Sequence, residues 1–177
     1  MKKITTPITE ADARSLRAGD QVLLSGVIWT ARDAAHKRWV AMLDKGETIP
    51  IPLQDQAVYF VGPCPARPGA VIGSAGPTTS GRMDLYSPRM IRETGLRAMI
   101  GKGERSQAVI DAVKECGGAY FAATGGAGAL IAQCIRSAEV VMFPDLGPEA
   151  VHRLEVEDMP LVVAIDSEGN NLYDRKK

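Results

Sequence analysis

The feature that most constrains the fold is the alternation, after residue 84, of short apolar runs with helix-like segments. The apolar runs of strand length span residues 96–100, 119–123, 139–143 and 161–166. The helix-like segments begin at Ser87-Pro88, span residues 106–116 and span about 126–137. Strands joined through helices pair in parallel and are covered by those helices. The pattern therefore predicts an α/β fold with layered sheet and helices.

The first third of the chain has a different pattern, rich in strands. Residues 21–30, 57–61 and 70–75 are expected strands, and the segment 62–69 between the last two is rich in Pro and Gly. This β-rich N-terminal part predicts either a second sheet or a partial barrel. Because the chain shows no repeat, low-complexity tract or linker, residues 1–177 are expected to form a single domain.

Charge and hydropathy exclude several classes of function. Twenty-one basic residues balance twenty-one acidic ones, so the chain has no general field to attract nucleic acid or an anionic membrane. No stretch approaches the roughly 20 apolar residues that a membrane-spanning helix needs, and no signal-peptide run follows Met1. We therefore expect a cytoplasmic protein with neither nucleic-acid nor membrane partners.

The three cysteines, Cys64, Cys116 and Cys134, are widely spaced. An odd number of scattered thiols is not a disulfide framework, and none has the close spacing of a metal site such as CxxC. Ordinary packed or idle thiols are the favoured interpretation, with no metal bound by this chain alone. Three thiolates could nevertheless hold a cluster, so a self-sufficient metalloenzyme remains an alternative.

Three segments that follow strands are rich in Gly, Thr and cationic side chains. They span residues 30–38, 76–84 and 100–105. Ligands bind at the carboxyl ends of parallel strands, where these segments fall. Together they predict an anion pocket formed by Arg32, Thr78, Thr79, Arg82 and Lys102. The alternative is a set of ordinary turns with solvated cations; Asp33 and His36 could orient Arg32, although a lone histidine is more often structural.

Four segments in this order resemble one known family. They are residues 30–38, 76–84, 101–103 and 154–160. The chain resembles the C-terminal domain of class I (iron–sulfur) fumarases and the separate β subunit of fumarases and L-tartrate dehydratases. The resemblance implies a swivelling β/β/α domain and a partner α subunit that carries a [4Fe–4S] cluster on its own cysteines. It also implies a hetero-oligomer of the α2β2 kind that acts on a small dicarboxylate.

The same resemblance implies a role for each residue of the pocket. Thr78 is implied as the catalytic base, supported by Thr79, with Lys102 beside it as a catalytic and carboxylate-binding group. Arg82 and Arg32 are implied to bind the carboxylates of the substrate. Cations next to a carboxylate stabilise the negative charge that proton removal creates there. The expected activity is the reversible hydration of fumarate to L-malate by a hydro-lyase that works only with its partner.

Other functions remain open at this stage. Gly81 and the Arg82-Met83-Asp84 sequence favour a fumarase over an L-tartrate dehydratase, but other C4 dicarboxylates are not excluded. A module that binds dicarboxylates without chemistry is an alternative of a different class.

Overall fold

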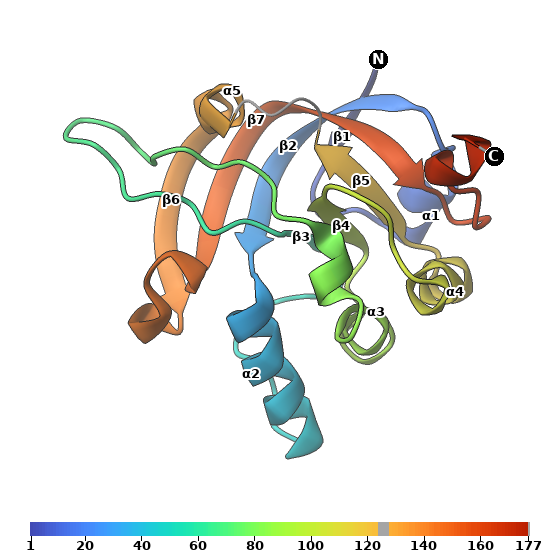
Figure 1. Ribbon diagram of the computed structural model, residues 1–177, viewed down its shortest axis with the longest axis horizontal. Coiled ribbons are helices and arrows are strands. Elements are labelled where there is room, and N and C mark those ends of the chain that lie inside the picture. The colour runs from blue at the N-terminus through green and yellow to red at the C-terminus, as the bar shows by residue number, and fades with distance from the viewer. Residues whose placement is uncertain (124–127, 177) are drawn as a thin grey trace.

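Seven strands form one sheet in the computed structural model, which describes residues 1–123 and 128–176 (Figure 1). The strands are β1 (Lys2–Thr5), β2 (Gln21–Thr30), β3 (Ala57–Tyr59), β4 (Ala98–Gly101), β5 (Ala119–Ala123), β6 (Ile135–Met142) and β7 (Val151–Ile165). The α-helices are α1 (Glu10–Arg14), α2 (Asp33–Asp44), α3 (Ser87–Thr94), α4 (Gln107–Cys116) and α5 (Gly128–Gln133). Three 3₁₀ helices are η1 (Ser80–Met83), η2 (Pro144–Glu149) and η3 (Leu172–Lys176).

The sheet closes on itself through its longest strand. Strands β1 to β5 pair in parallel in sequence order, as the helical crossovers predict. Strand β7 then runs antiparallel to β5 on one side and to β2 on the other, which closes β2, β3, β4, β5 and β7 into a ring and leaves β1 paired with β2 alone. Of the two architectures expected for the β-rich N-terminal part, the structure therefore has the partial barrel. Strand β6 extends β7 beyond the closed part.

Alternating side chains of the strands divide the core between the two faces of the sheet. In β3, Ala57 and Tyr59 belong to one apolar cluster and Val58 to the other. In β5, Phe121 belongs to the first cluster and Tyr120 to the second. This period of two is what buried strands require when both faces are covered.

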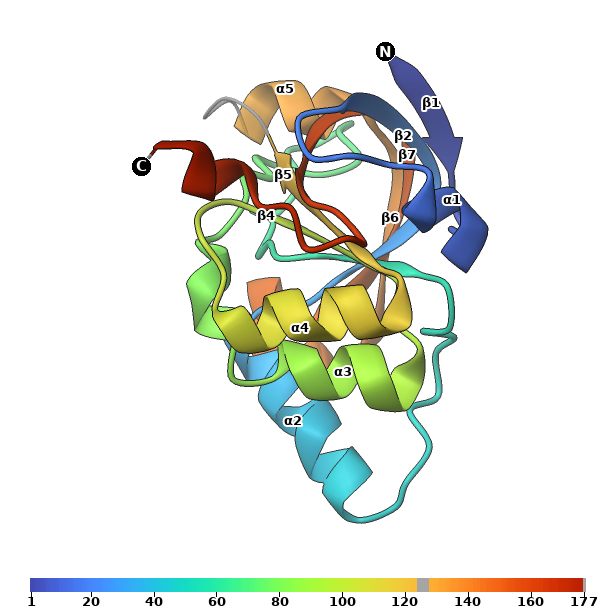
Figure 2. The same ribbon diagram turned by 90° about the vertical axis from the view of Figure 1, so that its right-hand side faces the viewer.

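The helices cover these faces unequally. Helices α2, α3 and α4 supply Trp39, Met90 and Val109 to the second cluster, whereas α1 and α5 contribute Ala13 and Ile131 to the first. Figure 2 shows α2, α3 and α4 together on one side of the sheet and α5 on the other. The predicted α/β class is confirmed. Among the described residues, no helix is both long and apolar enough to cross a membrane.

The predicted strand at residues 70–75 is wrong. The chain from Pro63 to Ser74 forms an irregular arm in which the Cys64 N–H donates to the Ser74 carbonyl at 2.9 Å and the Gly73 N–H donates to the Cys64 carbonyl at 3.0 Å. Pro63, Pro65 and Pro68 have no N–H to donate, so the arm cannot extend a ladder of hydrogen bonds.

The remaining differences concern the ends of three elements and one helix that was not predicted. The apolar run at 139–143 belongs to the longer β6, and the run at 161–166 is the end of the 15-residue β7, which also contains the 154–160 segment. The helix expected over about 126–137 is described only as Gly128–Gln133, and the first part of the prediction falls within residues 124–127, outside the described residues. Helix α2 was not predicted, although Ala35, His36 and Trp39 form a buried helical face.

Candidate active site

Parallel pairing brings the ends of three strands to one edge of the sheet. Thr30 of β2 pairs with Tyr59 of β3, which in turn pairs with Ile100 of β4. The residues that follow these strands therefore start from adjacent positions. Arg32 follows β2, and Lys102 follows β4. Two of the three polar segments identified in the sequence thus leave the same edge of the sheet.

The third segment is hydrogen-bonded into this edge between the other two. The Thr78 N–H donates to the Phe60 carbonyl, just beyond β3, at 2.8 Å. Thr79 forms a parallel bridge with Lys102, and the Ser80 N–H donates to the Lys102 carbonyl at 2.8 Å. The structure therefore places Thr78 and Thr79 next to Lys102, as the predicted pocket requires.

A glycine makes this close approach possible. The Cβ that any other residue would place at position 101 would collide with Ser80 Oγ and lie 2.9 Å from a ring carbon of Phe60. Gly101 is therefore needed for the segment of Thr78 and Thr79 to lie directly against the end of β4.

Arg32 lies at the start of α2, on the other side of the end of β3. The position of a Cβ at Gly62 is 3.1 Å from Arg32 Cδ, so the arginine extends along the chain that leaves β3. Arg32 Nε is 3.9 Å from Glu149 Oε1 of η2, which is an ion pair but too long for a hydrogen bond. Nε is buried and has no hydrogen-bond partner among the described residues. The guanidinium of Arg32 can therefore still donate a hydrogen bond to an anion bound at this edge of the sheet.

Arg82 belongs to η1, which directly follows Thr78 and Thr79. Thr79, Arg82 and Lys102 are exposed and Thr78 is half-buried, so these side chains form an open surface on this chain. Three segments thus contribute cationic residues, Arg32, Arg82 and Lys102, to the edge of the sheet at which Thr78 and Thr79 lie. This open surface can bind a small anion with a carboxylate at each end.

A buried arginine beneath this surface was not identified from the sequence. Arg105 Nε donates to Asp84 Oδ1 at 2.6 Å, and Nη2 donates to Ser87 Oγ at 2.8 Å. The guanidinium lies 5.2 Å from the ring centroid of Phe60 and 4.8 Å from that of Tyr120. Arg105 therefore anchors the end of η1 and the start of α3 to the sheet. An arginine in a stretch of charged residues carries no sequence signal of burial.

His36 is buried behind Arg32, and its side chain is neutral. Its Nδ1 lies 2.9 Å from the Arg32 carbonyl, which can only accept, so Nδ1 carries the proton. The pKa of His36 is lowered from 6.5 to about 4, chiefly by burial and in part by the charge of Arg105, while the bond to Arg32 and the charge of Asp33 oppose the shift. His36 thus helps to fix the backbone at Arg32 and does not face the open surface.

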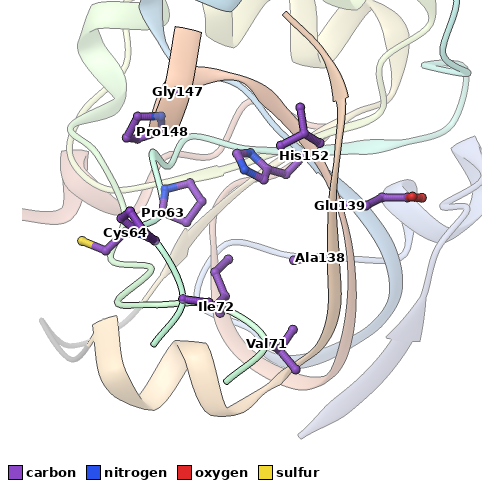
Figure 3. Close-up of a pocket in the computed structure, with 12 residues that line it drawn as sticks. Pro63, Cys64, Val71, Ile72, Ala138, Glu139, Gly147, Pro148 and His152 are labelled. Atoms are coloured by element: carbon purple, nitrogen blue, oxygen red, sulfur yellow. The ribbon is translucent and has the colours of Figure 1, made fainter. Parts of the chain in front are cut away.

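One cavity of the chain is separate from this surface. It has a volume of about 320 Å³ and lies between the arm from Pro63 to Ser74, β6 and η2. His152 and Glu139 are in its wall (Figure 3). None of the predicted site residues lines it. The described residues that form the wall of this cavity are largely apolar and include no lysine or arginine.

The three cysteines do not fit an iron–sulfur cluster. Cys116 packs against the second apolar cluster and Cys134 against the first, so the sheet lies between them, and Cys64 is exposed on the arm. Burial raises the pKa of the Cys116 and Cys134 thiols, which disfavours the thiolate that a metal needs. Among the described residues no three His, Cys, Asp or Glu side chains are grouped as metal ligands would be.

The fold and the site define a class: a mixed α/β domain with loops that carry lysine and arginine at the carboxyl ends of its parallel strands. A family model described as "Fumarase C-terminus" matches residues 2–176. The chain belongs to this family, as its sequence motifs indicated.

Relatives of two kinds share this domain. The chain is 42% identical over 151 residues to "Fumarate hydratase class I, aerobic" of Escherichia coli, covering 85% of this chain and 28% of that protein. It is 40% identical over 172 residues to a protein of Methanocaldococcus jannaschii provisionally named L(+)-tartrate dehydratase subunit beta, covering 94% of this chain and 88% of that one. The chain is also 39% identical to "Fumarate hydratase 2" of Leishmania major, and the match covers 28% of that protein. The chain therefore spans about a quarter of these fumarate hydratases but most of the separate subunit.

Proposed function

We propose that this chain is the β subunit of a [4Fe–4S]-dependent hydro-lyase, and that its reaction is the reversible hydration of fumarate to L-malate. One observation carries the proposal. In a chain of the fumarase C-terminus family, Thr78, Thr79 and Lys102 are brought together by backbone bonds at the end of the parallel strands. The proposed partner is an α subunit that holds the cluster, in a complex of the α2β2 kind.

The proposed roles follow from the chemistry of the groups. Thr78 would remove or return the proton on the carbon next to a carboxylate. Lys102 and Arg82 would bind that carboxylate and stabilise the negative charge that develops on it, and Arg32 would bind the second carboxylate. Thr79 would support Thr78. A threonine hydroxyl is a weak base, so adjacent cations that favour its ionised form are part of the proposal.

An open surface suits a subunit whose site is completed by another chain. Arg82 and Lys102 are exposed and Arg32 is half-buried, and Leu85, which follows η1, is 78% exposed. The proposed partner would cover Leu85 together with Arg82 and Lys102. The thiols of this chain are scattered, so the proposal assigns the cluster to the partner.

The decisive experiment is anaerobic co-expression with a candidate α subunit, followed by hydro-lyase assays with fumarate, L-malate and L-tartrate. We expect the two chains to co-purify and to interconvert fumarate and malate only together. Activity on tartrate alone would replace the substrate and keep the subunit role. Tight binding of fumarate by this chain alone, with a partner fully active without it, would favour a non-catalytic dicarboxylate-binding module.

Substitutions test the proposed residues within that complex. Lys102→Ala and Thr78→Ala should each lower kcat by at least about 100-fold, because each removes a group that acts in the transition state. Lys3→Ala is the matched control. Lys3 lies in β1, which pairs with the first half of β2 and so lies away from the strand ends of the site. Near-normal turnover in both site variants would refute their roles.

A further inference from the structure

The position of Lys102 is fixed by side chains from distant parts of the chain. Lys102 is exposed and lies between two glycines, Gly101 and Gly103, and the second has a φ of 88°. Glycines leave the backbone free to adopt several conformations. An exposed lysine in such a segment would sample many positions unless neighbouring groups held its backbone.

Three hydrogen bonds supply that restraint. The Lys102 carbonyl accepts from the Ser80 N–H at 2.8 Å. The Gly103 carbonyl accepts from the Tyr120 hydroxyl at 2.8 Å, and the Gly103 N–H donates to the Tyr173 hydroxyl at 3.2 Å. The partners come from η1, β5 and η3, so the segment of Lys102 is restrained from three sides.

Tyr120 also contacts the segment of the threonines. Its hydroxyl lies 2.7 Å from Ser80 Oγ, and Ser80 directly follows Thr79. A tyrosine hydroxyl has one proton and a carbonyl can only accept. The arrangement that satisfies all groups has Tyr120 donating to Gly103 and Ser80 donating to the oxygen of Tyr120. One buried hydroxyl thereby joins the segments that carry Thr79 and Lys102.

The Tyr120 ring is itself held in place. The ring is fully buried in the second apolar cluster, and the guanidinium of Arg105 lies 4.8 Å from its centroid. Burial raises the pKa of Tyr120, so the hydroxyl keeps its proton over the whole range in which proteins function. Ionisation of Tyr120 therefore does not break the hydrogen-bonded link in that range.

We propose that Tyr120 is a positioning residue, whose hydroxyl fixes Lys102 relative to Thr78 and Thr79 by hydrogen-bonding to Ser80 and Gly103 at once. Its importance for catalysis rests on the proposed function; its role as a link between the two segments does not. Tyr120 does not touch the open surface and takes no part in proton transfer. A displacement of about 1 Å at a reacting group can lower turnover by about 100-fold, so a residue of this kind has a measurable effect.

The test compares Tyr120→Phe with Tyr59→Phe. Tyr59 is also fully buried, and its hydroxyl donates to the Ala75 carbonyl at 2.6 Å, ahead of the site segment. Each substitution removes one buried hydroxyl and leaves the ring, so both should lower the melting temperature by similar amounts. Only Tyr120→Phe should remove the link that the Tyr120 hydroxyl makes between Ser80 and Gly103.

Two measurements are made on these variants. Amide hydrogen exchange by NMR on the full chain alone should show the Ser80 and Gly103 amides exchanging about tenfold faster in Tyr120→Phe and little changed in Tyr59→Phe. In the assembled complex, kcat should fall by about 10- to 100-fold in Tyr120→Phe and by less than about threefold in Tyr59→Phe. Tyr173→Phe, at a half-buried position where water can replace the lost group, should give a smaller loss of kcat than Tyr120→Phe.

Each outcome decides the inference. Unchanged exchange at Ser80 and Gly103 in Tyr120→Phe would overturn it, as would equal losses of kcat in the two matched variants. If the wild-type complex has no hydro-lyase activity, the proposed function fails, and the exchange data still decide whether Tyr120 joins the two segments.

Discussion

Replacing Asp84 by asparagine should destabilise the chain strongly, because Asp84 neutralises a buried arginine. The side chain of Arg105 is 0% exposed and that of Asp84 is 18% exposed, with 2.6 Å between Nε and Oδ1. Asp84 Oδ2 also accepts the Ser106 N–H at 2.7 Å. Asparagine has nearly the same shape, so Asp84→Asn removes the charge and one acceptor while the packing is kept.

The magnitude can be worked from this geometry. Charge centres about 4 Å apart attract by about 4 kcal/mol at an effective dielectric constant of about 20. Removal of one partner from a buried pair is measured to cost about 3–5 kcal/mol, because the other charge remains buried without compensation. The asparagine oxygen can accept from Arg105 or from Ser106 but cannot replace both carboxylate oxygens. We therefore expect a loss of about 3–5 kcal/mol in the free energy of unfolding.

Urea unfolding of the full chain at pH 7.5 measures this loss, with Glu157→Gln as the control. Glu157 accepts from Arg136 at 2.9 Å, and their side chains are 61% and 57% exposed. An exposed pair contributes about 0–1 kcal/mol. The slope of the unfolding free energy against urea should stay constant, so that the shift in midpoint reports stability. A loss in Asp84→Asn no larger than that in Glu157→Gln would refute the role given to Arg105 and Asp84.

Two further predictions concern His36 and Leu85. The pKa of His36 is about 4 in the folded chain against 6.5 for an ordinary histidine, so the unfolded chain binds more protons between these values. Stability should therefore be full above pH 6.5 and fall, by up to about 3 kcal/mol from this group, as the pH decreases toward 4. In His36→Asn, the asparagine amide can replace Nδ1–H as the donor to the Arg32 carbonyl. The urea midpoints at pH 7.5 and 5.0 should therefore differ less in this variant than in the wild-type chain. A difference equal to that of the wild type would contradict the lowered pKa of His36. Leu85→Ser should leave the melting temperature unchanged, since Leu85 is 78% exposed, and should weaken co-purification with the α subunit. Leu130→Ser, at a 62% exposed position on α5, serves as its control, and equal retention of the partner by both variants would exclude Leu85 from the interface.

Much of the architecture was determined by local pattern in the sequence. The runs at 98–101 and 119–123 and the helix over 107–116 follow from apolar periodicity and from the glycines that end the helix, which act within a few residues. The polar segments after β2 and β4 were predicted to converge because parallel strands end at one edge of a sheet. The motifs of four segments also identified the family, which the comparison over residues 2–176 confirms.

Only the tertiary structure decided how the sheet closes and what lies beneath the site. Strand β7 pairs with β2 across more than a hundred positions of the chain and with β5 across roughly 40, and no local pattern specifies such contacts. Tyr120 was predicted as part of a strand, but its link between Ser80 and Gly103 depends on which face of β5 it occupies. Arg105 had no signal of burial in the sequence, and its burial depends on Asp84, Phe60 and Tyr120 meeting around it. Sequence specifies periodicity and chemistry along the chain, whereas compensation of a buried charge or hydroxyl requires partners that only folding brings together.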